Sequence, residues 1–169
     1  YIRIPVNFAQ SIFGTQLASA IGNSLLPNSR DYPLDFIGDN TGPTLLSFYL
    51  NLENGTLSLM FSEILLNTSI SETAITIQNG FLATASYTLT GSISKSFNIN
   101  IVTVQLSSLD VLSIKGTPDL ATSAATTYLV HLSTLVSDVI GNPSIARLDG
   151  VSSLQVTQLA NDTTSPIFV

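Results

Sequence analysis

The sequence predicts an all-β fold, an antiparallel β-sandwich with Greek-key connections that is repeated in tandem along the chain. Three observations predict it. Apolar and polar residues alternate with period two in short runs, turn residues separate these runs, and one part of the sequence recurs further along the chain. Alternation with period two places successive side chains on opposite faces of a strand, so each run can bury one face in a core.

The recurrence divides the chain into repeats. Ile21-Gly22-Asn23 and Asp39 recur as Ile140-Gly141-Asn142 and Asp162, about 119 and about 123 residues later, which is the length of one small β domain. The sequence therefore predicts the C-terminal part of one repeat at residues 1–40, a complete repeat at 41–161 and the first strand of a third at 162–169. Such a chain is expected to be a stretch of a longer array.

Seven strands are expected in the complete repeat, because seven alternating runs are separated by turn residues. They cover residues 45–50, 57–62, 74–78, 86–90, 99–106, 128–132 and 151–159. Asn54-Gly55 is the strongest hairpin signal, since both central residues of a type I′ turn need a positive φ. Phe48 and Tyr49 are neighbours in the first strand, so one of them must face outward.

A short helix is expected at residues 108–115, with Ser107 or Ser108 as its N-cap. Its apolar residues suggest a buried face formed by Leu109 and Leu112, together with Val111 or Ile114. A second helical turn is expected at residues 121–125.

An enzymatic function is not expected. His131 is the only histidine, and alternation places it on the face opposite Val130 and Leu132, so we expect it at the surface or in an interface. The sequence has no cysteine and no Gly-x-Ser-x-Gly motif, which leaves a nucleophilic triad unsupported. The carboxylates that could form a glycosidase pair lie on turns and strand ends without a tryptophan to bind sugar: Glu53, Glu63, Glu72 and Asp110.

The composition favours an extracellular protein. Charged residues make up 9% of the chain, against about 25% in an average soluble domain, and serine and threonine supply roughly a quarter. Such a weakly charged surface is explained if it packs into an assembly or carries glycans. The net charge is −6 and the five cations are scattered, so nucleic acid is not an expected partner. No apolar run approaches the roughly 20 residues of a membrane span.

Three Asn-x-Ser/Thr sequons begin at Asn54, Asn67 and Asn161. All three fall on expected turns or strand edges, where a glycan can be accommodated. They are therefore the candidate sites for N-linked glycans if the chain passes through a eukaryotic secretory pathway.

Several motifs of the complete repeat carry a resemblance to a family. The matching residues are Asp39, Thr41, Pro43, Gly55-Thr56-Leu57, Leu59, Phe61-Ser62-Glu63, Asp138, Gly141 and Asn142. They resemble the Ig-like repeats of large secreted proteins, which include bacterial surface proteins and repeat proteins of algae and protists, some of them forming mastigonemes, the tubular hairs of flagella. The resemblance implies tandem Ig-like sandwiches in a fibre or on a cell surface. One departure is Ser19, which stands in the first copy where Asp138 stands in the second.

Two interpretations of residues 138–142 are open. The segment is either a tight turn in which Asp138 accepts backbone N–H groups or part of a metal site. Asp39, Glu63 and Asp138 could converge at one end of the domain and bind calcium, since residues 39–43 and 161–166 superficially resemble the calcium-binding linkers of cadherins. The alternative is a plain inter-domain linker in which Pro43 and Pro166 fix φ and limit flexing. No other cofactor is expected.

We therefore expect a structural segment of an extracellular filament or cell-surface appendage, whose partners are copies of itself or neighbouring repeats. Either the chain continues in both directions, or neighbouring chains complete its partial repeats by strand addition. The alternative from another class is an adhesin that binds glycans through one long loop, for which residues 81–86 and 93–97 are the candidates.

Overall fold

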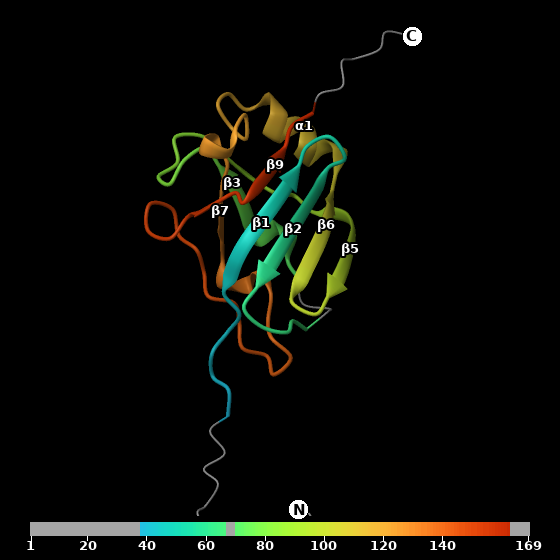
Figure 1. Ribbon diagram of the computed structural model, residues 1–169, viewed down its shortest axis with the longest axis vertical. Helices are drawn as coiled ribbons and strands as arrows, with labels where there is room; N and C mark the ends of the chain where they lie inside the picture. Colours follow the sequence, from blue (N-terminus) through green and yellow to red (C-terminus); the bar gives the residue numbers. More distant parts are fainter. Residues whose placement is uncertain (1–37, 67–69, 163–169) are drawn as a thin grey trace, which may run out of the picture. The chain divides into compact units, whose positions relative to one another are not determined.

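The computed structural model describes residues 38–66 and 70–162 (Figure 1). The described residues from Asp39 onward belong to one compact unit. Four expectations lie outside the described residues: the partial repeat at residues 1–37, the sequon at Asn67, the linker residue Pro166 and the strand that would follow Asp162.

Two sheets dominate the unit. The five-stranded sheet has the order β5-β6-β2-β1-β9 and the four-stranded sheet the order β4-β3-β7-β8. All neighbouring strands are antiparallel except β1 and β9, which are parallel. The strands are β1 (Leu45–Asn51), β2 (Thr56–Phe61), β3 (Ile75–Gln78), β4 (Ser86–Thr88), β5 (Ser92–Asn98), β6 (Ile101–Leu106), β7 (Tyr128–His131), β8 (Leu154–Gln155) and β9 (Gln158–Ala160). This mostly β arrangement, with one α-helix, is consistent with a β-sandwich, and we call it the two-sheet unit.

Alternation along the strands produces the core, as the sequence predicts. Leu57, Leu59 and Phe61 of β2 are fully buried, and so are Ile75 and Ile77 of β3 in the other sheet. Burying each such side chain contributes about 1.5–3 kcal/mol, so the facing apolar rows stabilise the pairing of the sheets. In β1, Phe48 lies in this core while Tyr49 is only half-buried, which confirms that one of the two neighbours faces outward.

Strand β5 was not predicted from the sequence. It is an edge strand whose residues are mostly exposed, and serine and lysine occupy most of it, so no apolar alternation marks it. Residues 93–97, a candidate adhesin loop, are therefore part of a strand. The predicted strand at 99–106 is correspondingly shorter, because Ile99 lies in the turn between β5 and β6 with a φ of 56°.

The strand predicted at 151–159 is also wrong as a single element. It is divided into β8 and β9, which belong to different sheets. The chain changes sheets between Val156 and Thr157: the Val156 amide donates to the Thr127 carbonyl, whereas the Thr157 amide donates to the Phe48 carbonyl of β1. The alternation of apolar and polar residues continues across this change of sheet. The sequence alone therefore predicted a single strand.

The turn between β1 and β2 is longer than a type I′ hairpin. It covers residues 52–55, and only Gly55, with a φ of 70°, has a positive φ in it. The Asn51 side chain accepts hydrogen bonds from the amides of Glu53 and Asn54, which closes the loop before Gly55 reverses the chain. A four-residue loop of this kind needs one left-handed residue at its end, and glycine supplies it.

Helix α1 (Ser108–Gly116) lies where the sequence predicts it, with Ser107 as its N-cap. Its buried face was predicted only in part. Ile114 is buried, as one of the two alternatives had it, but Leu109 and Leu112 are 62% and 67% exposed, and Asp110 is buried in their place. Oδ1 of Asp110 accepts hydrogen bonds from the Tyr87 hydroxyl at 2.8 Å and from the amide and hydroxyl of Thr90 at 3.0 and 2.8 Å. These bonds fix the orientation of the helix.

Three short 3₁₀ helices complete the described elements: η1 (Glu72–Ala74), η2 (Ala124–Thr126) and η3 (Ser133–Leu135). Of these, η2 overlaps the helical turn expected at residues 121–125.

The parallel pairing of β1 and β9 places the two ends of the unit apart. Both strands run in the same direction, so the chain enters the unit before β1 and leaves it after β9 at the opposite end (Figure 1). We call the first the Asp39 end, formed by residues 39–44, 62–64 and 136–145. The second is the α1 end, formed by α1, the β1–β2 turn and residues 161–162.

Candidate metal centre at the Asp39 end

The segment that leads into β1 is attached to the two-sheet unit by its backbone. The Asp39 carbonyl accepts a hydrogen bond from Nδ2 of Asn142 at 3.1 Å, and the Pro43 carbonyl accepts one from the Ile145 amide at 2.9 Å. Pro43, predicted as a linker residue, is buried. Because the attachments begin at Asp39, the position of this residue is fixed relative to the sheets.

Gly42 explains how the segment approaches so closely. A Cβ atom built on Gly42 would lie 1.8 Å from the carbonyl oxygen of Pro143, far inside van der Waals contact. Only a residue without a side chain can therefore let residues 39–44 lie against the 142–145 segment.

Asp138 closes the tight turn that one of the two interpretations predicted. Its Oδ1 accepts hydrogen bonds from the amides of Ile140, Gly141 and Asn142 at 2.9, 2.6 and 2.8 Å, and Oδ2 accepts one from Nδ2 of Asn142 at 2.7 Å. Gly141 has a φ of 102°, which a side chain would disfavour. Burial opposes the charged carboxylate, but the hydrogen bonds from Asn142, Ile140 and Gly141 outweigh it and lower the pKa of Asp138.

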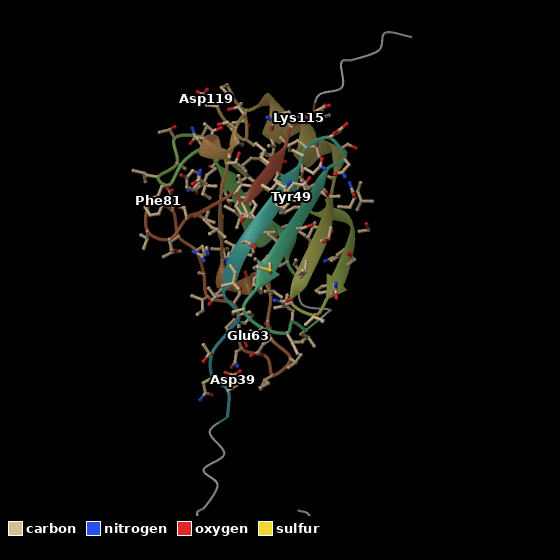
Figure 2. The ribbon with its side chains drawn as sticks, in the orientation of Figure 1. Asp39, Tyr49, Glu63, Phe81, Lys115 and Asp119 are labelled. Atoms are coloured by element: carbon tan, nitrogen blue, oxygen red, sulfur yellow. The ribbon has the colours of Figure 1, made fainter. Side chains whose placement is uncertain are left out.

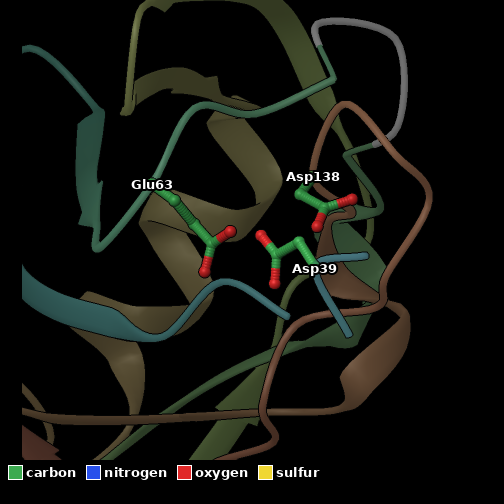
Figure 3. Close-up of side chains that lie close together, drawn as sticks. All are labelled: Asp39, Glu63 and Asp138. Atoms are coloured by element: carbon green, nitrogen blue, oxygen red, sulfur yellow. The ribbon is translucent and has the colours of Figure 1, made fainter. Parts of the chain in front are cut away.

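Three carboxylates meet at this end (Figure 3). One oxygen of each of Asp39, Glu63 and Asp138 lies within 4.8 Å of the others, and this is the one such group of three within residues 38–66 and 70–162. Calcium binds oxygen at about 2.3–2.6 Å, so two ligands of one ion are at most about 5 Å apart. The three carboxylates are therefore close enough together to share one calcium ion after small side-chain movements, although the sequence separates them by up to 99 positions.

The donor set suits a hard cation. It consists of oxygen alone, and calcium takes six to eight oxygen ligands that include waters. Asp39 and Glu63 can each offer two oxygens, while Asp138 already uses most of its acceptor capacity in the turn. A cation held here would connect Asp39 of the incoming segment to Glu63 after β2 and to Asp138, which would stiffen the attachment of the segment.

The two described sequons lie at the opposite, α1 end. Asn54 is exposed in the β1–β2 turn, and its Oδ1 accepts hydrogen bonds from the amide and hydroxyl of Thr56. Asn161 is exposed after β9, and its Nδ2 donates to the Thr122 carbonyl at 3.1 Å. Both side chains are accessible for modification.

We expected His131 at the surface or in an interface. In the structure it is buried, with 2% of its surface exposed. The strand alternates as predicted, with Leu129 and His131 on the inner face, so the error was to assign the inner face to Val130. Nδ1 lies 2.9 Å from the Leu132 carbonyl, and Nε2 has no hydrogen-bond partner among the described residues. Burial, opposed by the Leu132 carbonyl and assisted by the nearby charge of Arg147, lowers the pKa of His131.

The carboxylates considered for glycoside hydrolysis have other roles. Glu72 pairs with Lys95 at 2.8 Å and accepts from Ser92, and these contacts outweigh burial and lower its pKa. Asp110 is buried under α1, and its pKa is also lowered, since hydrogen bonds from Thr90, Tyr87 and Ser107 outweigh burial. Glu53 is exposed in the β1–β2 turn.

Two residues that matter here were not singled out as site residues. Gly42 admits the segment to its place, and Asn142 joins Asp138 to Asp39 through one side chain. Asn142 had a signal in the sequence, because Asn23 occupies the same place in the first copy of the Ile-Gly-Asn turn. No repeated residue marked Gly42 in the sequence, because the corresponding residue in the second copy is Ser165.

Comparison with known proteins adds no relative. The sequence matches no protein-family model, no curated protein and no solved structure. Within the part of the chain that the structure describes, no helix has the length and apolarity needed to cross a bilayer.

Proposed function

We propose that the chain is a structural segment of an extracellular filament or cell-surface appendage, built from tandem Ig-like sandwiches with Greek-key connections. One observation carries the proposal: the strands that receive and release the chain, β1 and β9, are parallel neighbours. Units of this topology can be joined end to end without the chain doubling back. The recurrence of Asp39 as Asp162 supplies the sequence evidence that another repeat follows.

The same pairing suits a load-bearing role. A force applied through both ends of the unit shears β1 along β9, so their hydrogen bonds are loaded together rather than one after another. In the paired register of β1 and β9, Tyr49 lies opposite Gln158, Leu50 opposite Leu159 and Asn51 opposite Ala160. The Leu52 amide extends it with a hydrogen bond to the Ala160 carbonyl at 2.8 Å.

The outer faces support lateral packing in an assembly. Ser58 and Thr103 pair across β2 and β6 through their hydroxyls at 3.1 Å, and Thr76 and Thr88 pair across β3 and β4 at 2.8 Å. Hydroxyl rows of this kind are polar but uncharged. They therefore allow sheets of neighbouring units to approach without the repulsion that a charged face would impose.

The test is to locate the protein in native material. Gold-labelled antibodies raised against the chain should decorate filaments or surface appendages in electron micrographs, and the intact protein should be much larger than 17.9 kDa. Label on dispersed particles, together with an intact mass near 17.9 kDa, would contradict a continuous array. Filaments built from a 17.9 kDa species would instead favour strand addition between chains.

An adhesin remains the second candidate, because one predicted loop does present apolar side chains. Phe81 and Leu82 are exposed, and the loop that carries them is fixed by hydrogen bonds from the Ala83 amide to Asp149 and from the Gly150 amide to the Phe81 carbonyl. A rigid aromatic tip is a common anchor in recognition. A glycan array probed with the chain and with Phe81→Ser distinguishes the two functions, since an adhesin should bind and lose binding on substitution.

A further inference from the structure

Exposed aliphatic side chains gather at the α1 end. Ile93, Leu109 and Leu112 are 67%, 62% and 67% exposed, although leucine and isoleucine of this size are usually buried. Ile93 and Leu112 line an open groove of about 320 Å³, together with the apolar Leu52, Leu106 and Val111 and the oppositely charged Lys115 and Glu53. Exposed apolar side chains that gather around a groove mark an interaction surface.

The Asp39 end offers such a surface. Ile64, Val139 and Ile140 are all exposed there, and they follow Glu63 and Asp138 directly in the sequence. This end is thus apolar with an acidic centre, whereas the groove at the α1 end is apolar with Lys115 and Glu53 in its lining. Both surfaces therefore combine exposed aliphatic side chains with charged groups.

One position of the repeat, occupied by Asp39 and again by Asp162, contacts the Asp39 end in one copy and the α1 end in the other. Asp162 forms an ion pair with Lys115 of α1 at 2.7 Å. Its counterpart one repeat earlier is Asp39, which lies with Glu63 and Asp138 at the other end of the unit. If a following repeat has the same structure, its own Glu63 and Asp138 counterparts surround Asp162. Lys115 then lies beside all three carboxylates, and the two ends must be close together.

The connection between repeats is short enough to allow this. Seven residues separate Ala160, where β9 ends, from Phe168, the counterpart of Leu45 at the start of β1. Even fully extended they span only about 25 Å, which is less than the length of most domains of this size. Two successive units are therefore held within reach of each other.

We propose that the α1 end of each unit docks on the Asp39 end of the following copy of the same fold, with Ile93, Leu109 and Leu112 in the apolar contact and Lys115 facing the carboxylates. This inference rests on the proposed tandem array and specifies its joint. The occupant of the groove is the next repeat, and the joint is heterologous, so it propagates in one direction.

The full chain itself can report the joint, because Lys115 and Glu63 lie near opposite ends of one unit (Figure 2). A zero-length carbodiimide cross-linker joins lysine ammonium groups to carboxylates only where they touch. The unglycosylated chain at high concentration should yield cross-links from Lys115 to Glu63 or Asp138, which can form only between molecules. Their yield should rise with protein concentration.

A matched pair of variants tests the apolar contact. Leu112→Ser should reduce the cross-linked fraction about tenfold, the loss expected when one leucine is removed from an apolar interface. Leu82→Ser is the control, because Leu82 is 69% exposed but lies in the 79–85 loop outside both ends. Both variants should melt like the parent chain, since neither side chain is buried.

Two results would overturn the joint: Lys115 linked only to Asp162 of its own chain, or equal cross-linking of Leu112→Ser and Leu82→Ser. Native filaments without these cross-links would support the proposed array and contradict the joint. Cross-links together with native material that contains only dispersed particles would support the joint and contradict the proposed filament.

Discussion

Replacing Gly42 by alanine tests whether the incoming segment is held by close backbone contact. The new methyl group would lie 1.8 Å from the Pro143 carbonyl oxygen and 2.8 Å from its carbonyl carbon. Both atoms belong to the backbone, so no side chain can rotate away to make room. The segment must move outward by more than 1 Å, roughly the difference from an ordinary contact of about 3.4 Å.

The cost of that movement follows from what it breaks. Overpacking a close contact costs about 1–3 kcal/mol. The hydrogen bonds from Asn142 to the Asp39 carbonyl and from Ile145 to the Pro43 carbonyl would also lengthen, at about 1 kcal/mol each. We therefore expect Gly42→Ala to lower the free energy of unfolding by about 3–5 kcal/mol, or the melting temperature by more than about 10 °C.

The control is the same substitution where space is available. A Cβ atom on Gly116, at the end of α1, meets no atom within 4 Å. Gly116→Ala should leave stability unchanged or raise it slightly, because alanine favours the helix. Thermal and urea unfolding of both variants measure the difference. A Gly42→Ala chain that melts within about 2 °C of the parent would refute the close attachment, since strain of 2 kcal/mol cannot escape detection.

Three other substitutions or conditions have defined outcomes. Stability should fall on acidification: the folded-state pKa of His131 is lowered from 6.5 and that of Asp138 from 3.8, so in both cases the unfolded chain binds more protons. Urea titrations should show the first loss below pH 6.5 and a further loss below about pH 4.5, where Glu72 and then Asp110 and Asp138 bind protons first in the unfolded chain, and His131→Gln should remove only the first. Ile99→Asn should raise the free energy of unfolding by about 1 kcal/mol, because a β-branched residue is strained at a φ of 56° and asparagine is not; an unchanged urea midpoint would contradict this. Calcium should raise the melting temperature of the chain and chelation should reverse it, whereas Asp39→Asn, which removes one carboxylate of three, should abolish the calcium effect.

The sequence predicted the strands whose inner residues are apolar and whose outer residues are polar. β2, β3 and β6 largely meet that condition, and so their positions were foreseeable, whereas β1 and β7 were found from the period of two alone, since Leu46 faces outward in β1 and His131 faces inward in β7. β5 does not meet it, because it buries little and its register depends on pairing with β6 rather than on a core. The division of 151–159 was equally hidden, since period two records the face of a residue and not the sheet to which it belongs.

The candidate site was predictable only in part. Asp138 could be placed in a turn because aspartate before Gly-Asn accepts local amides, and this needs no knowledge of the fold. The approach of Asp39 and Glu63 to Asp138 depends on which loops share one end of the unit, a property of the topology. The inward face of α1 was missed for a different reason: hydrogen bonds to the buried Asp110 outweighed the burial of Leu109 and Leu112, and apolar periodicity does not record them.

Calcium and Lys115 would act on the same carboxylates, and this makes their effects separable. Asp39, Glu63 and Asp138 surround a space that fits one cation, and a calcium ion there would displace an ammonium group from a preceding unit. Added calcium should therefore decrease the cross-links between Lys115 and Glu63, while sodium chloride of equal ionic strength should decrease them less, because screening alone weakens an exposed pair only moderately. An increase on addition of calcium would show that the ion joins the two ends directly, and Lys115 would then have no part in holding the joint.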